Sequence, residues 1–223
     1  MSGPCPLCGG ESHDFYENTR RTYYECETCS LVFVDARQLL TAEQEKAEYD
    51  LHRNDVRDPA YREFLSRLFD PLNQRLTEGS KGLDFGCGSG PALAAMFREA
   101  GHRMNVYDTF YAPDKMALVG PYDFITATEV VEHLHNPRDE IERLWGMLKP
   151  GGWLGLMTKM VVNQRTFATW HYKNDPTHVI FFSQNTFDAL AYHLGADLEF
   201  IGKDVILLHK RNEEASAPQP SQS

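Results

Sequence analysis

The stretch LDFGCGSGP, residues 83–91, places three glycines within five positions directly after an apolar run. A glycine-rich turn lets a bound molecule approach the backbone closely, because no side chain stands in the way. The spacing G-x-G-x-G differs from the G-x-G-x-x-G of dinucleotide-binding turns, and the Gly-Lys-Ser/Thr ending of a phosphate-binding loop is missing. A plain strand-to-helix turn would have the same composition, so the neighbouring residues have to decide what this turn binds.

Acidic residues near this turn favour a nucleoside that carries an amino acid. Asp84 lies inside the stretch, and Asp108 ends a second expected strand. A carboxylate at a strand end can accept hydrogen bonds from both hydroxyls of a ribose, although a solvated strand end is the alternative. The helix N-terminus after the turn suits a carboxylate. S-Adenosylmethionine has these groups, and its two cationic centres tolerate nearby acids.

Strands and helices alternate from residue 81 onward, which indicates a mostly parallel sheet with helices on both faces. The final two strand runs are separated by a link so short that they must form an antiparallel hairpin. We therefore expect an α/β, Rossmann-like, doubly wound sheet with an antiparallel last strand. The expected strands are GLDF (82–85), MNVYD (104–108), YDFITAT (122–128), WLGLMT (153–158), ADLEFIG (196–202) and DVILLHK (204–210).

Several motifs in this region resemble those of the class I S-adenosylmethionine-dependent methyltransferases. LDFGCGSGP is similar to their first motif, and the acid of VYD (106–108) is similar to their ribose-binding position. The resemblance covers about residues 80–210 and disfavours a nicotinamide dehydrogenase. Further similar stretches are YDFITATEVVEHL (122–134), LKPGGWLGLMT (148–158) and THVIFFSQNTF (177–187), the last of which resembles the branch that includes quinone O-methyltransferases.

The resemblance implies S-adenosylmethionine as the cofactor. Between Asp108 and Tyr122 the family usually has a helix, a strand and a further acid near the adenine, but residues 109–121 are too few for them. The manner of adenine binding is therefore open, with Phe110 or Tyr111 as candidates to stack on the ring. The expected cofactor-binding residues are Asp84, Gly86, Cys87, Gly88, Gly90, Asp108, Thr109, Phe110, Thr128 and Glu129.

Four of the five cysteines form two pairs, CPLC (5–8) and CETC (26–29), with 17 residues between them. Each pair can offer two thiolates to one ion at tetrahedral spacing, which is typical of a zinc ribbon. No further polar ligand is apparent, so a closed structural Zn²⁺ site is expected. Disulfides, which a reducing compartment disfavours, and free thiols are the alternatives. The expected ligands are Cys5, Cys8, Cys26 and Cys29.

Charge and hydropathy bear on partners and location. The chain of 223 residues has a net charge of −10, and residues 1–50 contain four basic and ten acidic residues. This balance opposes nucleic acid as a partner, although a local basic face would still allow RNA. There is no signal pattern and no apolar run near eighteen residues, so we expect a cytoplasmic protein without a membrane partner. The oligomeric state is left open.

The chain divides into four expected regions. Thr41 with Gln44 predicts a capping box, and Asp58-Pro59 predicts the start of a second helix. Pro71 is expected to kink or split that helix. The regions are a zinc ribbon (1–40), a helical connector (41–79), a methyltransferase domain (80–210) and a disordered tail (211–223).

Candidate catalytic residues follow strands whose carboxyl ends should overlook the sulfonium. Methyl transfer needs an aligned acceptor, exclusion of water and, for some acceptors, a base. His133 is the first candidate for the base and His178 the second, while Tyr172 is expected to orient the acceptor. For each histidine, a hydrogen-bonded structural role is the alternative.

The resulting functional expectation is methyl transfer to a small-molecule acceptor, at oxygen or carbon. RNA or protein is the alternative acceptor, because similar N-terminal zinc sites occur in some deoxysugar methyltransferases and in some ribosomal RNA methyltransferases. Another alternative is a non-catalytic S-adenosylmethionine-binding protein that uses the ribbon to hold a partner. A dehydrogenase is the third alternative.

Overall fold

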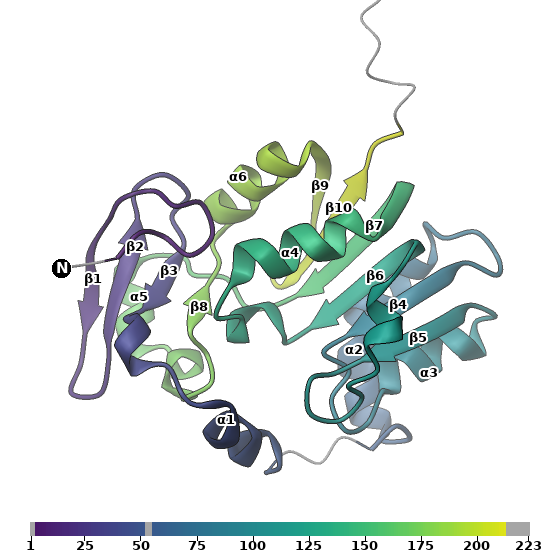
Figure 1. Cartoon of the computed structure of the whole chain (residues 1–223), viewed down its shortest axis with the longest axis horizontal. Helices are drawn as coiled ribbons and strands as arrows, with labels where there is room; N and C mark the ends of the chain where they lie inside the picture. The colour runs from purple at the N-terminus through teal and green to yellow at the C-terminus, as the bar shows by residue number, and fades with distance from the viewer. Residues whose placement is uncertain (1–2, 52–54, 213–223) are drawn as a thin grey trace, which may run out of the picture.

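The computed structural model describes residues 3–51 and 55–212. A six-stranded central sheet has the order β5-β4-β6-β7-β10-β9 (Figure 1). The first four of these strands are parallel, and β10 lies antiparallel between β7 and β9. The expected parallel sheet with a final antiparallel hairpin is therefore confirmed. Its strands are β4 (Lys81–Phe85), β5 (Arg103–Tyr107), β6 (Tyr122–Thr128), β7 (Leu148–Met157), β9 (Ala196–Ile201) and β10 (Val205–Lys210).

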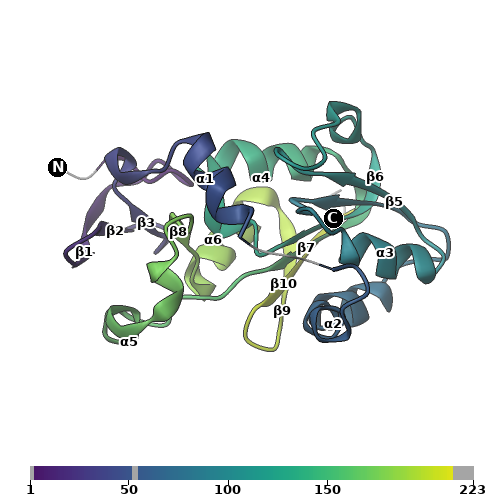
Figure 2. The ribbon, with the colours of Figure 1, turned by 90° about the horizontal axis from the view of Figure 1, so that it is seen from below.

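Helices cover both faces of the central sheet. One face carries α2 (Pro59–Asn73) and α3 (Ala92–Glu99), whose apolar residues form one buried cluster with Phe124 and Leu207. The other face carries α4 (Pro137–Gly146) and α6 (Gln184–Leu194), as Figure 2 shows for α4. The packing is close where α2 crosses β7, because a Cβ on Gly155 would lie 3.0 Å from both Leu68 and Leu72 side chains.

Helix ends follow the local signals of the sequence. Thr41 and Gln44 form a capping box at the start of α1 (Ala42–Tyr49), and Asp58 caps α2 ahead of Pro59. α2 is not split at Pro71 but runs through it to Asn73. A proline this close to a helix end removes only one backbone hydrogen bond, which the packing of α2 on the sheet can offset.

A second, four-stranded sheet has the order β1-β2-β3-β8. Its first three strands are β1 (Ser12–Glu17), β2 (Thr22–Cys26) and β3 (Val32–Val34). The fourth, β8 (Ile180–Phe181), comes from the C-terminal half of the chain and pairs antiparallel with β3. Phe167 of α5 (Gln164–Thr169) packs edge-on against Phe15 and Tyr23 of this sheet. The N-terminal strands are therefore joined to the segment between β7 and α6.

Two further expectations concern irregular segments. Residues 109–121 contain a tight turn closed by an Asp108–Ala112 bridge and the 3₁₀ helix η2 (Lys115–Leu118), so the stretch is indeed too short for a full helix and strand. Of the expected disordered tail, residues 213–223 lie outside the described residues. Within the described parts of the chain, no helix is long and apolar enough to cross a membrane.

Candidate functional site

A cavity of about 900 Å³ lies where strands β4 to β7 end at their carboxyl side. This is where open α/β sheets bind ligands. Helices α1 and α2 supply further walls, including Tyr49, Tyr61 and Phe64. Gly90 does not line the cavity; its carbonyl accepts a hydrogen bond from the Ala92 amide at the start of α3. The expected site residues that do line it are Asp84, Gly86, Cys87, Gly88, Asp108, Thr109, Phe110, Thr128, Glu129, His133, Tyr172 and His178.

The glycine loop is held by its neighbours on both sides. The amides of Gly86 and Cys87 donate to the Tyr107 carbonyl at 2.8 and 3.2 Å. Gly86 has a φ of 70°, and a Cβ there would lie 2.4 Å from Cγ2 of Val130. Glycine is therefore required at position 86 by the approach of Val130, besides any approach of a ligand. The sequence contained no signal for this contact.

Asp108 orders the glycine loop where that loop lines the cavity. Its Oδ2 accepts the Gly88 amide at 3.0 Å, and its Oδ1 accepts the amides of Phe110 at 2.8 Å and Tyr111 at 3.0 Å. A carboxylate has about four acceptor positions, so capacity for a ribose hydroxyl remains. The Phe110 ring meets Tyr49 of α1 at 5.8 Å between centroids, which makes an aromatic wall beside Asp108.

Asp84, near the end of β4, and Cys87, in the loop itself, are both buried. The Thr126 hydroxyl donates to Oδ1 of Asp84 at 2.9 Å, and burial raises the pKa of this carboxyl to about 6. Burial, together with the charge of Asp84, raises the pKa of the Cys87 thiol to about 12. Cys87 is therefore a neutral thiol near pH 7 and no candidate nucleophile, because the thiolate is the reactive form.

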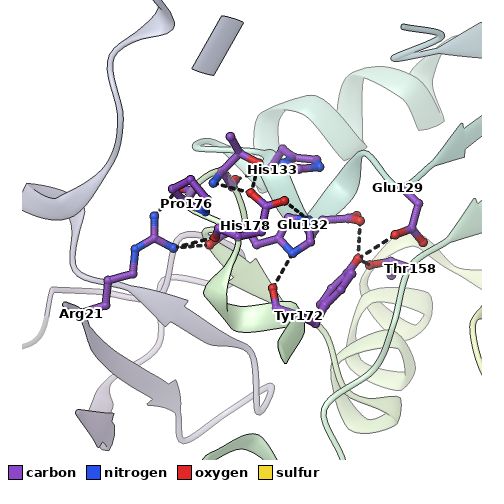
Figure 3. Close-up of polar contacts among 10 residues, drawn as sticks. Arg21, Glu129, Glu132, His133, Thr158, Tyr172, Pro176 and His178 are labelled. Atoms are coloured by element: carbon purple, nitrogen blue, oxygen red, sulfur yellow. Dashed lines mark hydrogen bonds and ion pairs between the residues drawn. The ribbon is translucent and has the colours of Figure 1, made fainter. Parts of the chain in front are cut away.

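Two carboxyl groups and a phenol meet at the other end of the cavity (Figure 3). The Tyr172 hydroxyl donates to Oε1 of Glu132, and it lies 3.3 Å from both Oε2 of Glu129 and Oγ1 of Thr158. Burial raises the pKa of both carboxyls, and the charge of Glu132 raises that of Glu129 further. Glu129 also has a φ of 50°, a strained conformation for a residue with a side chain. Glu132 is not among the site residues expected from the sequence, and its full burial had no sequence signal.

Both candidate histidines are fixed by backbone carbonyls. Nδ1 of His133 lies 3.0 Å from the Thr177 carbonyl oxygen, and Nδ1 of His178 lies 2.8 Å from that of Tyr172. A carbonyl only accepts, so each Nδ1 carries a proton and each neutral ring has its lone pair on Nε2. Burial, with the nearby His133, lowers the pKa of His178 to about 4. The two rings are 4.7 Å apart between centroids, whereas His135 pairs with Glu45 of α1 at 2.8 Å.

The segment that carries His178 is held by Arg21, from the turn between β1 and β2 (Figure 3). Nη1 of Arg21 donates to the carbonyls of Asp175 at 3.2 Å and His178 at 2.8 Å, and Nη2 donates to that of Pro176. On the opposite side, the Val179 amide donates to the Glu132 carbonyl at 2.9 Å. The N-terminal sheet therefore backs the polar end of the cavity, which the sequence did not indicate.

The four cysteines of the two pairs come together at one end of the N-terminal sheet. Sγ of Cys5 and Cys29 are 3.7 Å apart, and those of Cys8 and Cys26 are 3.3 Å apart. All four sulfurs lie within 4.8 Å of one another. A tetrahedral site with Zn–S bonds of about 2.3 Å has sulfurs roughly 3.8 Å apart, so the cluster is compatible with zinc. Ser30 takes a φ of 55° after the second pair, where a glycine is more usual.

A family model described as a methyltransferase domain matches residues 52–199, more than half of the chain. The chain therefore belongs to the methyltransferase domain family. It is an S-adenosylmethionine-dependent methyltransferase, and the dehydrogenase alternative is set aside. No curated protein matches the sequence.

Solved methyltransferase structures are similar to parts of the chain. An O-methyltransferase family protein from Burkholderia thailandensis has a TM-score of 0.47 and 16% identity, over 69% of this chain and 59% of its own. A possible histamine N-methyltransferase from Thermotoga maritima has a TM-score of 0.47 and 15% identity, over 77% of this chain and 96% of its own. A chain from the complex of the Haloferax volcanii Trm112 methyltransferase activator with a putative methyltransferase has a TM-score of 0.47 and 10% identity. The match covers 72% of this chain and 100% of that chain.

Proposed function

We propose that the protein transfers the methyl group of S-adenosylmethionine to a small-molecule acceptor, at oxygen or carbon. The observation that carries this proposal is that one cavity joins the glycine loop to the buried cluster around Tyr172. The cofactor would lie along the loop, with its ribose at Asp108 and its adenine near Phe110. Its carboxylate would face the N-terminus of α3, where free amides favour a negative charge.

The acceptor would occupy the end lined by His133, Tyr172 and His178. In-line transfer needs the acceptor atom in contact with the methyl carbon, and this end faces the loop across the cavity. Cavity-lining carboxyl groups include Glu45, Asp108, Glu129 and Asp175, whereas Lys159 is the one lysine or arginine among the described lining residues. Such an acidic lining repels a phosphate backbone, which favours a small molecule over RNA.

The Cys₄ cluster would hold a structural Zn²⁺ that stabilises the N-terminal sheet. Each thiolate ligand is contributed by a short turn, and the ribbon has too small a core to fold well without a metal. In this proposal residues 1–40 form the ribbon, residues 41–79 the helical connector and residues 80–210 the methyltransferase domain. The ribbon would support the acceptor end of the cavity through Arg21 and the β3–β8 pairing. This arrangement also suits the resemblance to small-molecule and quinone O-methyltransferases that the motifs suggested.

The test is to incubate the protein with methyl-labelled S-adenosylmethionine and a cell extract, then separate metabolites, RNA and protein. Label in a small metabolite supports the proposal and identifies the acceptor. Label in RNA or in protein would instead establish the alternative acceptor class. A matched sample of Asp108→Ala protein, which should bind the cofactor weakly, measures the background transfer by enzymes of the extract.

A further inference from the structure

We infer that Glu129 is the general base of methyl transfer and that it takes its proton from a hydroxyl group of the acceptor. The reaction itself rests on the proposed function, whereas the placement of the Glu129 carboxyl stands on the geometry of the cavity. From the sequence, Glu129 is expected to bind the cofactor, and the base is expected to be a histidine. The position, backbone and charge of Glu129 favour this carboxyl group instead.

Glu129 follows directly on β6 and lies between the glycine loop and Tyr172. The next residue, Val130, packs against the loop, because a Cβ on Gly86 would lie 2.4 Å from its Cγ2. On the other side, Oε2 of Glu129 lies 3.3 Å from the Tyr172 hydroxyl (Figure 3). All of these residues line one cavity. A methyl group that passes from a cofactor on the loop to an acceptor beside Tyr172 therefore passes the Glu129 carboxyl.

The backbone of Glu129 is held in a strained conformation. Its φ is 50°, and its amide donates to the Met157 carbonyl at the end of β7 at 2.8 Å. A residue with a side chain keeps such a conformation only where the surrounding structure imposes it, and such residues gather at active sites. The neighbouring strand therefore fixes the point from which this carboxyl enters the cavity.

The Glu129 carboxyl lacks a cationic partner of its own. Its Oε1 is buried and has no hydrogen-bond partner among the described residues. Burial raises the pKa of Glu129 to about 8, with a further contribution from the charge of Glu132. Without cofactor the group is therefore mostly a neutral acid near pH 7, because a buried unpaired charge is costly. The charged or titratable groups that act on it include Glu132, Lys159, Tyr172, Asp204 and Tyr61.

The cofactor supplies the missing positive charge. A cation close to a carboxyl group favours its ionised form, and the sulfonium of S-adenosylmethionine is a permanent cation. Binding of the cofactor therefore converts Glu129 into a carboxylate, which is the form that accepts a proton. A base whose pKa lies near the working pH is the most effective. Burial lowers the pKa of the alternative base His178 to about 4, which makes this imidazole a weak base.

The hydroxyl group of an acceptor can donate a hydrogen bond to this carboxylate before the reaction, whereas a C–H group does so poorly. Oxygen is therefore the methylated atom. During transfer the O–H bond breaks, and the proton joins the Glu129 carboxylate to form a carboxylic acid. The acceptor oxygen attacks the methyl carbon, an O–C bond forms, and the C–S bond breaks with its electron pair left on sulfur. The products are the methyl ether and S-adenosylhomocysteine, which has no sulfonium charge, so Glu129 keeps the proton until the next cofactor molecule binds.

The first test counts the protons released when S-adenosylmethionine binds. Calorimetric titrations in buffers of different ionisation enthalpy give this number. At about pH 7 we expect the wild type to release roughly half a proton or more above the value for Glu129→Gln, and the ligand's own titration cancels in this difference. Glu132→Gln should also release less than the wild type, because loss of the Glu132 charge lowers the pKa of Glu129. Glu78→Gln is the control, because Glu78 is exposed and does not line the cavity.

The second test follows the transfer of labelled methyl groups to a protein-free metabolite extract as the pH is varied. At saturating cofactor we expect Glu129→Gln to be slower than the wild type and Glu78→Gln by about a hundredfold or more. The wild-type rate should rise with pH and level off once Glu129 is ionised, and Glu132→Gln should level off at a lower pH. The rate of Glu129→Gln should keep rising, because it depends on ionisation of the acceptor hydroxyl itself.

Transfer by Glu129→Gln at the wild-type rate, equal proton release by these two proteins, or a methyl group found on carbon would overturn the inference. Glu129→Gln keeps the size of the side chain and an oxygen that can accept from Tyr172, so this variant is expected to fold. Wild-type transfer with an unaffected Glu129→Gln would remove the base and leave the proposed function intact. Cofactor binding without transfer by the wild type would count against the proposed function itself, and the base would fall with it.

Discussion

Nη1 of Arg21, in the turn between β1 and β2, donates a hydrogen bond of 2.8 Å to the backbone carbonyl of His178, which lines the cavity. The same guanidinium also binds the carbonyls of Asp175 and Pro176. Charged hydrogen bonds of this kind are each worth roughly 1.5–3 kcal/mol. Arg21 therefore couples the N-terminal strands to the position of His178, although it is separated from this residue by more than half of the chain.

Replacement of this guanidinium should impair methyl transfer without affecting the cofactor. We expect Arg21→Ala to lower kcat/KM for the acceptor by at least tenfold, while the Kd of S-adenosylmethionine stays within twofold. Arg21→Lys should also be impaired, because an ammonium is a point donor and lacks the planar fork that reaches several carbonyls. Steady-state kinetics and calorimetric titration of the cofactor measure the two effects.

The exposed neighbour Arg20 provides the control, and Arg20→Ala should behave like the wild type. Equal losses of acceptor kinetics and cofactor affinity in Arg21→Ala would indicate general unfolding and contradict a local role for Arg21.

Loss of the cysteine site should act on the same end of the cavity. Cys29→Ser removes one thiolate from the four-sulfur cluster, and we expect the variant to lose zinc and to melt at a lower temperature. Methyl transfer should fall with the loss of the ribbon, whereas cofactor binding at the glycine loop should persist. Cys87→Ser should keep its zinc, because Cys87 lies outside the cluster. Mass spectrometry measures the zinc content of both variants. A fully zinc-loaded Cys29→Ser protein would exclude this cysteine as a ligand.

Local signals in the sequence predicted much of the central sheet. The strand runs at β4, β5 and β6 and the two-strand hairpin at the end are read from apolar runs and short links. The caps at Thr41 and Asp58 are also local, because a side chain bonds to an amide two or three residues away. Family motifs predicted the cofactor loop, and the structure brings most of the expected residues to one cavity.

Contacts between distant segments could not be predicted in this way. β8 has only two residues, and its pairing with β3 depends on tertiary packing that no local pattern encodes. The three carbonyls bound by Arg21 are backbone atoms, so no residue type in the sequence marks them. The burial of Glu132 likewise follows from the docking of the segment at 172–179. The division into a ribbon and a methyltransferase domain stays a prediction, with β8 bridging the two.

Replacement of Asp108 tests directly whether the cofactor binds beside the glycine loop. We expect Asp108→Ala to weaken S-adenosylmethionine binding by at least tenfold, about 1.4 kcal/mol, because the ribose loses an acceptor and the amides of Gly88 and Phe110 lose theirs. Asp114→Ala is a suitable control, because Asp114 caps the neighbouring η2 turn without lining the cavity. Calorimetric titration measures both, and an unchanged affinity in Asp108→Ala would remove this residue from the ribose role.

The contact between Gly86 and Val130 predicts a large difference between two glycine substitutions. Gly101→Ala introduces a Cβ at a φ of 92° with no atom within 4 Å, so only the backbone conformation is penalised. This should lower the free energy of unfolding by roughly 1–2 kcal/mol. At Gly86 the φ of 70° is comparable, but the new Cβ would lie 2.4 Å from Cγ2 and 2.9 Å from Cγ1 of Val130. A β-branched side chain has little rotamer freedom to move aside.

We therefore expect Gly86→Ala to lower the free energy of unfolding by about 1–3 kcal/mol more than Gly101→Ala does, because overpacking a core typically costs this much. Urea unfolding gives both values. The double variant Gly86→Ala with Val130→Ala should recover part of the difference, since it removes the methyl groups that clash. Equal costs for the two single variants would mean that the loop relaxes around residue 86, and the glycine there would then be explained by the cofactor or by its backbone conformation alone.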